Sequence, residues 1–171
     1  MAFTASAIFR AWPLAINGQG QTAAVLPASY AGLGADTVKA ALYNNTTTPD
    51  KDAALTATGY NSAGSQWVVA NEVIDTLNSN WVAGGRTLAS KTLTNPSTGV
   101  FMFDAADLAG AGNVTITATF GCLVYDDTIV VGTGGIADEG VCYNYFGGTQ
   151  TVTNGTFTIV WNANGIFRFT T

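Results

Sequence analysis

The sequence predicts an all-β protein, an antiparallel β-sandwich or small open barrel with one short helix and an irregular N-terminal arm. Apolar runs return about every 10 to 20 residues between turn-rich segments, and the longest alternates apolar with polar residues at a period of two. Thr, Asn, Ser and Gly fill most polar positions, as is typical of strands and turns, and charged residues make up only 10% of the chain. We therefore expect an arm over residues 1–35 and one β-sandwich domain over residues 36–171.

The first 35 residues differ from the rest of the chain. They contain Ala, Gly and isolated large apolar residues such as Phe9 and Trp12, but no sustained period. Glycine-rich stretches at 18–21 and 32–34 interrupt them. We expect this arm to pack on a neighbouring subunit instead of on its own core.

Regular structure is expected to begin after the arm. Residues 37–43 alternate enough to form a strand, which the turn-rich run 44–50 ends. Pro49 favours the start of one short helix that continues through Leu55, with Thr48 as its N-cap.

The C-terminal half carries the clearest β pattern. Residues 114–125 alternate apolar with polar side chains, which predicts one long strand. Turns at 147–148 and 154–155 predict that the strands around them pair as an antiparallel meander, with 104–112 as a loop. The other expected strands are 67–73, 86–94, 99–103, 141–146, 156–161 and an edge strand at 166–169.

Composition argues against several classes of protein. No window approaches the roughly 18 to 20 uninterrupted apolar residues that span a bilayer, so no membrane partner is expected. The N-terminal residues lack a basic region followed by a long apolar stretch, so we expect no cleaved secretory signal and synthesis in the cytoplasm. The net charge is −5 and the six Lys and Arg residues are scattered, which argues against nucleic-acid binding.

No residue pattern indicates catalysis. The chain has no histidine, which removes the usual general base and the usual metal ligand. The glycine-rich segment 132–135 lacks a following Lys-Ser or Lys-Thr, so we interpret it as a hairpin loop instead of a phosphate loop. We assign no catalytic, cofactor-binding or metal-ligating residue and expect no cofactor.

Three pairs of acidic residues are candidates for carboxylate chemistry. We expect them to be solvated turn residues, with a loop calcium site as the main alternative. The pairs are Asp104 with Asp107, Asp126 with Asp127, and Asp138 with Glu139.

Two cysteines and seven aromatic residues have more than one interpretation. Cys122 and Cys142 lie in apolar runs, so we expect buried thiols, and a cross-strand disulfide is the alternative if their strands are neighbours. We expect the aromatic residues to fill the core or a subunit interface, with a sugar-binding platform as the alternative. These aromatic residues are Trp67, Trp81, Trp161, Tyr125, Tyr143, Tyr145 and Phe146.

Nine short motifs follow one another in a recognisable order over about residues 36–170. They are DTVKAAL (36–42), TPD (48–50), NEV (71–73), GGRTLASKT (84–92), FMFDAADL (101–108), TITA (115–118), LVYDDT (123–128), YNYFGG (143–148) and GTFTIVWNANGI (155–166). Together they resemble a family of small β-rich virion proteins of tailed bacteriophages. The resemblance implies a component of the assembled particle, similar to capsid decoration or cement proteins.

The expected function is therefore structural and not enzymatic. We predict a capsid decoration protein of the virion, a homotrimer over local three-fold positions that clamps major capsid protein subunits and contacts neighbouring virion proteins. Low charge and available strand edges favour such contacts. A tail or baseplate component is the first alternative, and a receptor- or glycan-binding module is the second.

Overall fold

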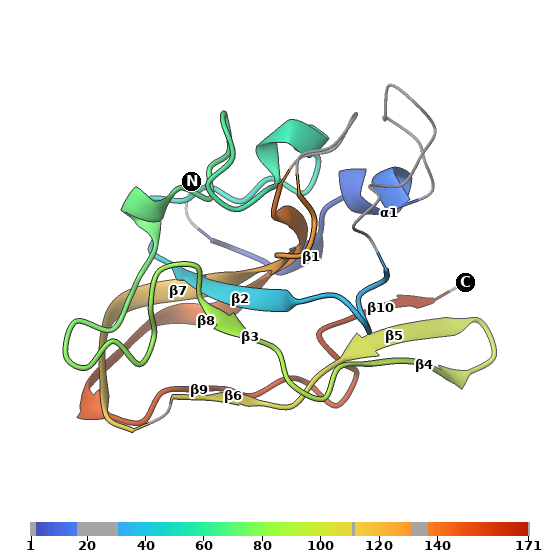
Figure 1. The fold of residues 1–171 in the computed structure, drawn as a ribbon. Helices are drawn as coiled ribbons and strands as arrows, with labels where there is room; N and C mark the ends of the chain where they lie inside the picture. Colours follow the sequence, from blue (N-terminus) through green and yellow to red (C-terminus); the bar gives the residue numbers. More distant parts are fainter. Residues whose placement is uncertain (1–2, 17–30, 111, 131–136, 171) are drawn as a thin grey trace.

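An antiparallel sheet of five strands forms the centre of the computed structural model, which describes residues 3–16, 31–110, 112–130 and 137–170 (Figure 1). The strand order is β1-β8-β7-β2-β3, so the two longest strands lie next to each other. The strands are β1 (Ala7–Ile8), β2 (Val38–Tyr43), β3 (Arg86–Thr87), β7 (Val114–Asp126) and β8 (Glu139–Gly155).

Two smaller antiparallel sheets accompany the central one. One has the order β10-β5-β4, with β4 (Thr92–Ser97), β5 (Val100–Asp104) and β10 (Phe167–Thr170). The other pairs β6 (Leu108–Ala109) with β9 (Thr158–Ile159). The prediction of an all-β antiparallel fold is confirmed, and the described residues form no closed barrel.

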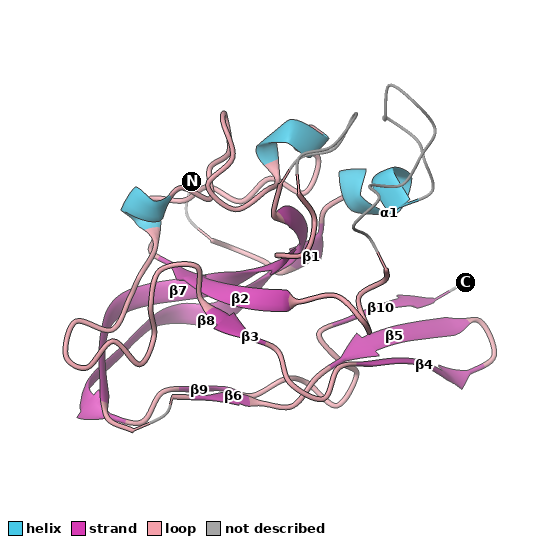
Figure 2. Ribbon diagram, viewed as in Figure 1, coloured by secondary structure: helices cyan, strands magenta, loops and turns pink. Residues whose placement is uncertain are grey.

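The helical segments are short and lie on one side of the central sheet, as Figure 2 shows. They are α1 (Ala11–Ile16) and two 3₁₀ turns, Leu55–Ala57 and Val69–Asn71. The paired strands β6 and β9 lie on the opposite side, and the β4–β5 hairpin projects from the edge of the molecule (Figure 1).

The long alternating run forms a single strand, β7, as predicted, but the alternation does not survive along its whole length. The register against β8 shifts between Ile116 and Gly121, and Ala118 has a positive φ of 56°. Such a bulge redirects the side chains that follow it. Residues 121–126 are all buried, because other parts of the chain cover both faces of the sheet there.

The N-terminal residues belong to the core of their own chain. Phe3, Phe9 and Trp12 are at most 2% exposed and lie in the same apolar cluster as the central strands. The ring of Phe9 lies 5.9 Å from that of Trp67 and 5.4 Å from that of Tyr143. The prediction that the arm packs on a neighbouring subunit is therefore wrong for residues 3–16, while residues 17–30 lie outside the described residues.

The predicted helix is misplaced. Where we expected a helix from Pro49, the Asp50 carboxylate accepts a hydrogen bond from the Asp52 N–H (2.9 Å), which stabilises a turn. Only Leu55–Ala57 is helical, as a single 3₁₀ turn. The α-helix lies in the arm, where Pro13 occupies the first turn, a position that tolerates proline.

Several strand predictions are confirmed and others are wrong. The strands expected at 37–43, 99–103 and 166–169 are present as β2, β5 and β10. The run 67–73 forms a 3₁₀ turn instead, and 86–94 is divided between β3 and β4.

The predicted hairpin between 141–146 and 156–161 is absent. β8 continues through the glycines at 147–148 and pairs with β7, while β9 pairs with β6 inside the expected loop 104–112. Turn-forming residues indicate where a chain can bend, but they do not specify which strands pair.

Candidate functional site

A groove of about 480 Å³ lies between the middle of β8 and the segment 157–165. Four half-buried aromatic side chains line it: Tyr145 and Phe146 from β8, and Phe157 and Trp161 from the opposite side. Ile159, which is 5% exposed, also lines it. The groove therefore presents aromatic surface to solvent.

Hydrogen bonds hold the largest of these rings in place. The indole Nε1–H of Trp161 donates to the Ala106 carbonyl (3.2 Å), and the Trp161 backbone N–H donates to Oδ1 of Asp107 (2.9 Å). On the other wall, the Tyr145 N–H donates to the Ser6 hydroxyl (2.8 Å). Both walls of the groove are therefore anchored to other segments of the chain.

The polar lining of the groove is uncharged. Amide side chains come from Asn144, Gln150 and Asn162, and hydroxyls come from Ser6 and Thr158. None of the lining residues that the structure describes is Lys, Arg, Asp or Glu. Amide groups donate and accept hydrogen bonds at the same time, so the groove suits a ligand that does both.

The seven aromatic residues of interest divide between the core and this groove. Trp67, Trp81, Tyr125 and Tyr143 are at most 6% exposed, which confirms the prediction of a core position for them. The remaining three, Trp161, Tyr145 and Phe146, line the groove.

A second cluster consists of buried carboxyl groups. Asp36, Asp126 and Glu139 are only 3%, 0% and 1% exposed. Asp126 lies opposite Glu139 on one side and Val38 on the other, at the end of the central sheet. The Asp36 carboxylate accepts a hydrogen bond from the Gly32 N–H (2.8 Å), which fixes it beside this end of the sheet.

Burial favours the protonated forms of two of these acids. Burial, and then the nearby Asp36 carboxylate, raise the pKa of Asp126. Burial, and then Asp126, raise the pKa of Glu139 to about 8. Oδ2 of Asp126 and Oε1 of Glu139 have no hydrogen-bond partner among the described residues, so ionisation would leave charge on buried, unpaired atoms.

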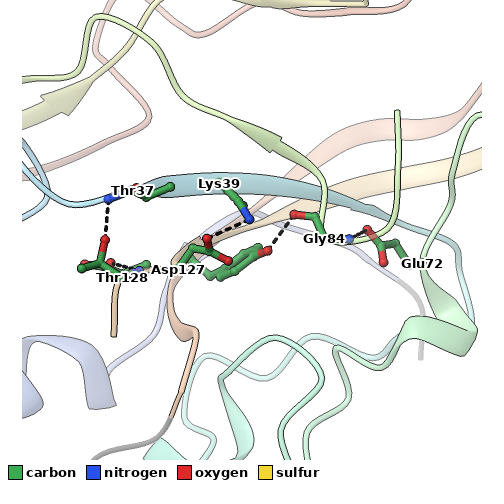
Figure 3. Close-up of polar contacts among 8 residues, drawn as sticks. Thr37, Lys39, Glu72, Gly84, Asp127 and Thr128 are labelled. Carbon is green, nitrogen blue, oxygen red and sulfur yellow. Dashed lines mark hydrogen bonds and ion pairs between the residues drawn. The ribbon is translucent and has the colours of Figure 1, made fainter. Parts of the chain in front are cut away.

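A polar network on the central sheet ties loops to its strands (Figure 3). The Tyr125 hydroxyl donates to the Gly84 carbonyl (2.6 Å), and the Gly84 N–H donates to Oε1 of Glu72 (2.9 Å). Oε2 of Glu72 accepts from the Tyr60 hydroxyl (2.8 Å), and the Tyr60 ring stacks on that of Tyr125 at 4.9 Å. Burial raises the pKa of Tyr60 and of Tyr125, so both phenols stay protonated and keep donating.

The prediction of solvated turn acids is wrong for Asp126 and Glu139, which are buried. Both lie at the ends of long strands, and the neighbouring Asp and Gly residues made them resemble turn residues. The sequence does not distinguish Asp36 as a candidate, because no second acid stands beside it.

The other four acids differ in exposure. Asp107 is exposed, and Asp127 forms an ion pair with Lys39 (2.8 Å; Figure 3). Asp104 and Asp138 are partly buried. Within the part of the chain that the structure describes, no group of three or more His, Cys, Asp or Glu side chains is arranged to hold a metal ion, so the calcium alternative gains no support there.

The two cysteines are buried free thiols, as predicted. Cys122 lies opposite Asn144 in the β7–β8 pair, whereas Cys142 lies opposite Val124. The cysteines therefore stand on neighbouring strands but not directly opposite each other. Burial raises the pKa of both thiols, which keeps them in the protonated, unreactive form.

The small sheet β10-β5-β4 forms a third surface. All six residues of β4 are exposed, and its only strand neighbour among the described residues is β5. A hollow of about 520 Å³ lies beside the β4–β5 turn, lined by Val100, Phe101 and Phe169 among others. This surface combines an open strand edge with the exposed Phe169 and the half-buried Phe101.

Comparison with known proteins gives no match: no family model, no curated protein and no solved structure is similar to the chain. Of the helices that the structure describes, none is long and apolar enough to cross a membrane.

Proposed function

We propose that this chain is a non-enzymatic structural protein of a tailed-phage virion, and that it decorates the capsid by binding major capsid protein subunits. The observation that carries the proposal is the β10-β5-β4 sheet, whose edge strand β4 is wholly exposed. An exposed edge presents unpaired backbone N–H and C=O groups, to which a strand of another protein can add.

The edge strands of the central sheet are shorter than β4 and are therefore less suited to pairing with another protein. They are β1 and β3, and each has only two residues. Short edge strands are a common protection against unwanted pairing. β4 is longer, with six residues; Pro96 and the register shift between Thr94 and Ser97 interrupt it, so residues 92–94 are the part of this edge that a partner strand can join.

Exposed apolar side chains of the same small sheet, on β4 and β10, add to the surface. Leu93 and Phe169 are 43% and 37% exposed, and Phe101 packs near the ring of Phe169 at 6.1 Å. Aromatic and aliphatic residues at the centre of an interface supply most of its binding free energy. The exposed apolar residues and the strand edge lie on one small sheet, which suits a single protein partner.

The low charge of the chain fits permanent assembly. β4 has no charged residue, and the whole chain has only 17 charged side chains in 171 residues, 6 basic and 11 acidic. Few charges lower the desolvation cost when surfaces pack together. We propose that the protein assembles as a homotrimer over local three-fold positions of the shell.

Immunogold labelling of purified particles tests the location. With an antibody to this chain, gold spread over the heads in electron micrographs supports the decoration role. Gold confined to tails or tail tips overturns it and favours the tail or baseplate alternative. Particles that lack the protein and receive the same antibody provide the control.

A further inference from the structure

We propose that the groove between β8 and the segment 157–165 binds a neutral saccharide. This second activity does not rest on the proposed virion role. The volume of the groove, about 480 Å³, lies within the range of roughly 300 to 1,000 Å³ that is typical of small-ligand sites. It is large enough for one or two sugar rings.

The aromatic lining fits the apolar faces of sugars. Phe146 and Trp161 are half-buried residues of the lining, and the Phe146 ring lies 6.3 Å from that of Phe157, whereas the Tyr145 ring stacks on Phe3 at 6.5 Å. Aromatic faces carry partial negative charge, which attracts the weakly positive C–H groups on a sugar face. A stack of this kind needs a ring that is already held in place.

Trp161 meets that requirement. Its indole N–H donates to the Ala106 carbonyl (3.2 Å) and its backbone N–H to the Asp107 carboxylate (2.9 Å). Because these bonds fix the ring before any ligand arrives, binding does not have to order it.

The polar lining fits hydroxyl groups. Sugar hydroxyls donate and accept hydrogen bonds, as do the amides of Asn144, Gln150 and Asn162 in the groove. No described lining residue carries a charge that would pair with a phosphate, sulfate or carboxylate. A charged ligand would lose its hydration without gaining an ion pair, so the lining favours a neutral one.

A saccharide fits this lining better than an extended peptide. β8 and β9 are each paired along one edge, with β7 and β6, and at the groove the Tyr145 N–H already donates to the Ser6 hydroxyl (2.8 Å). The amide and hydroxyl groups of the lining match the many hydroxyls of a sugar ring, whereas a peptide backbone presents only one donor and one acceptor per residue.

A glycan array followed by titration tests the proposal. The array carries neutral oligosaccharides beside sialylated and sulfated ones, and the full chain is the probe. We expect saturable binding to at least one neutral oligosaccharide. Tryptophan fluorescence, titrated with that oligosaccharide, then gives the dissociation constant, because Trp161 lines the groove.

A double variant, Gln150→Glu with Asn162→Asp, assigns the binding to the groove. Both changes keep the size of the side chain and remove the amide donors, and Oδ1 of residue 162 can still accept from the Asn164 N–H. Gln150 also loses its own contacts to the Phe146 and Gly148 carbonyls (3.4 Å each), so urea unfolding of the variant is measured beside its binding. We expect binding to weaken by about tenfold or more, as for the loss of one net hydrogen bond. The matched control is Asn45→Asp with Asn113→Asp, two exposed positions outside the groove, which should bind like the parent.

Four outcomes would overturn the proposal. The first is that the full chain binds no neutral oligosaccharide, and the second is that it binds acidic glycans alone. The third is that the groove variant and its control lose the same amount of binding. The fourth is that the full chain binds no sugar while the groove variant loses its attachment to particles. The last would assign the groove to a protein segment. None of the first three changes the immunogold result, so the two proposals fail separately.

Discussion

Glu139 makes the stability of the fold depend on pH. Burial raises its pKa from the ordinary value of 4.5 to about 8, so the folded protein holds this proton more tightly than the unfolded chain does. Between these two pH values the folded state is protonated and the unfolded state is not, and the free energy of unfolding therefore falls as pH rises. This contribution is fully present below about pH 4.5 and is lost above about pH 8.

Glu139→Gln should remove this part of the pH dependence. The amide has nearly the same shape and cannot ionise, so we expect the variant to be more stable than the parent at pH 9, on the order of a few kcal/mol, with a smaller difference at pH 5. Urea unfolding at pH 5, 7 and 9 measures this. Asp50→Asn, which removes an exposed carboxylate, is the control, and parallel pH profiles for parent and Glu139→Gln would contradict the prediction.

Gly121 shows that β8 and the N-terminal residues together set a steric limit on β7. A Cβ atom at this position would lie 2.6 Å from a ring carbon of Phe3 and closer still to the Asn144 carbonyl oxygen. We expect Gly121→Ala to lower the free energy of unfolding by about 1 to 3 kcal/mol, the usual cost of overpacking. Urea unfolding checks this against Gly34→Ala, where the nearest atom is 3.7 Å away. Equal stability of the two variants would mean that Phe3 does not pack there.

Secondary-structure elements were predictable where the sequence has enough length to show a period. β2 and β7 carry alternation and match predicted strands, whereas β1 and β6 have two residues each and show none. The packing of the arm was not predictable for the same reason. β1 and the six-residue α1 are too short to show a repeating pattern of buried residues in the sequence. A deletion of residues 1–35 therefore tests folding more than attachment to a particle.

The β4 edge gives a prediction about attachment. Thr92→Lys with Thr94→Lys places two charges on an exposed strand, and Lys on an edge strand opposes the addition of a further strand. If this edge binds the capsid, we expect the variant to fold normally and to bind particles at least tenfold more weakly. Co-sedimentation with particles stripped of this protein measures the binding.

The matched control places the same two charges elsewhere. Thr153→Lys with Thr156→Lys changes two exposed threonines outside β4, so it should bind like the parent. Equal weakening by both variants would indicate a general effect of charge, and full binding by the β4 variant would exclude this edge as the attachment surface.

At the scale of the whole molecule, the sequence predicted the fold class but not the functional surfaces. The groove brings together Ser6, the middle of β8 and the segment 157–165, and this juxtaposition depends on long-range packing. The sequence identified Trp161, Tyr145 and Phe146 as candidates for a sugar platform, yet it could not separate them from the four aromatic residues in the core. Strand composition is similar in both groups, and only tertiary contacts decide which rings stay accessible.

The position of the N-terminal residues also fixes the order of events during synthesis. Ala7 pairs with Tyr143, and the Phe9 N–H donates to the Val141 carbonyl (3.1 Å), so residues 7–9 leave the ribosome well before the strand with which they pair. Contacts between such distant parts of a chain form slowly. Until β8 emerges, Phe3, Phe9 and Trp12 remain uncovered on the nascent chain, where they are targets for chaperones and for aggregation. Production of soluble protein should therefore depend on the rate of translation and on temperature.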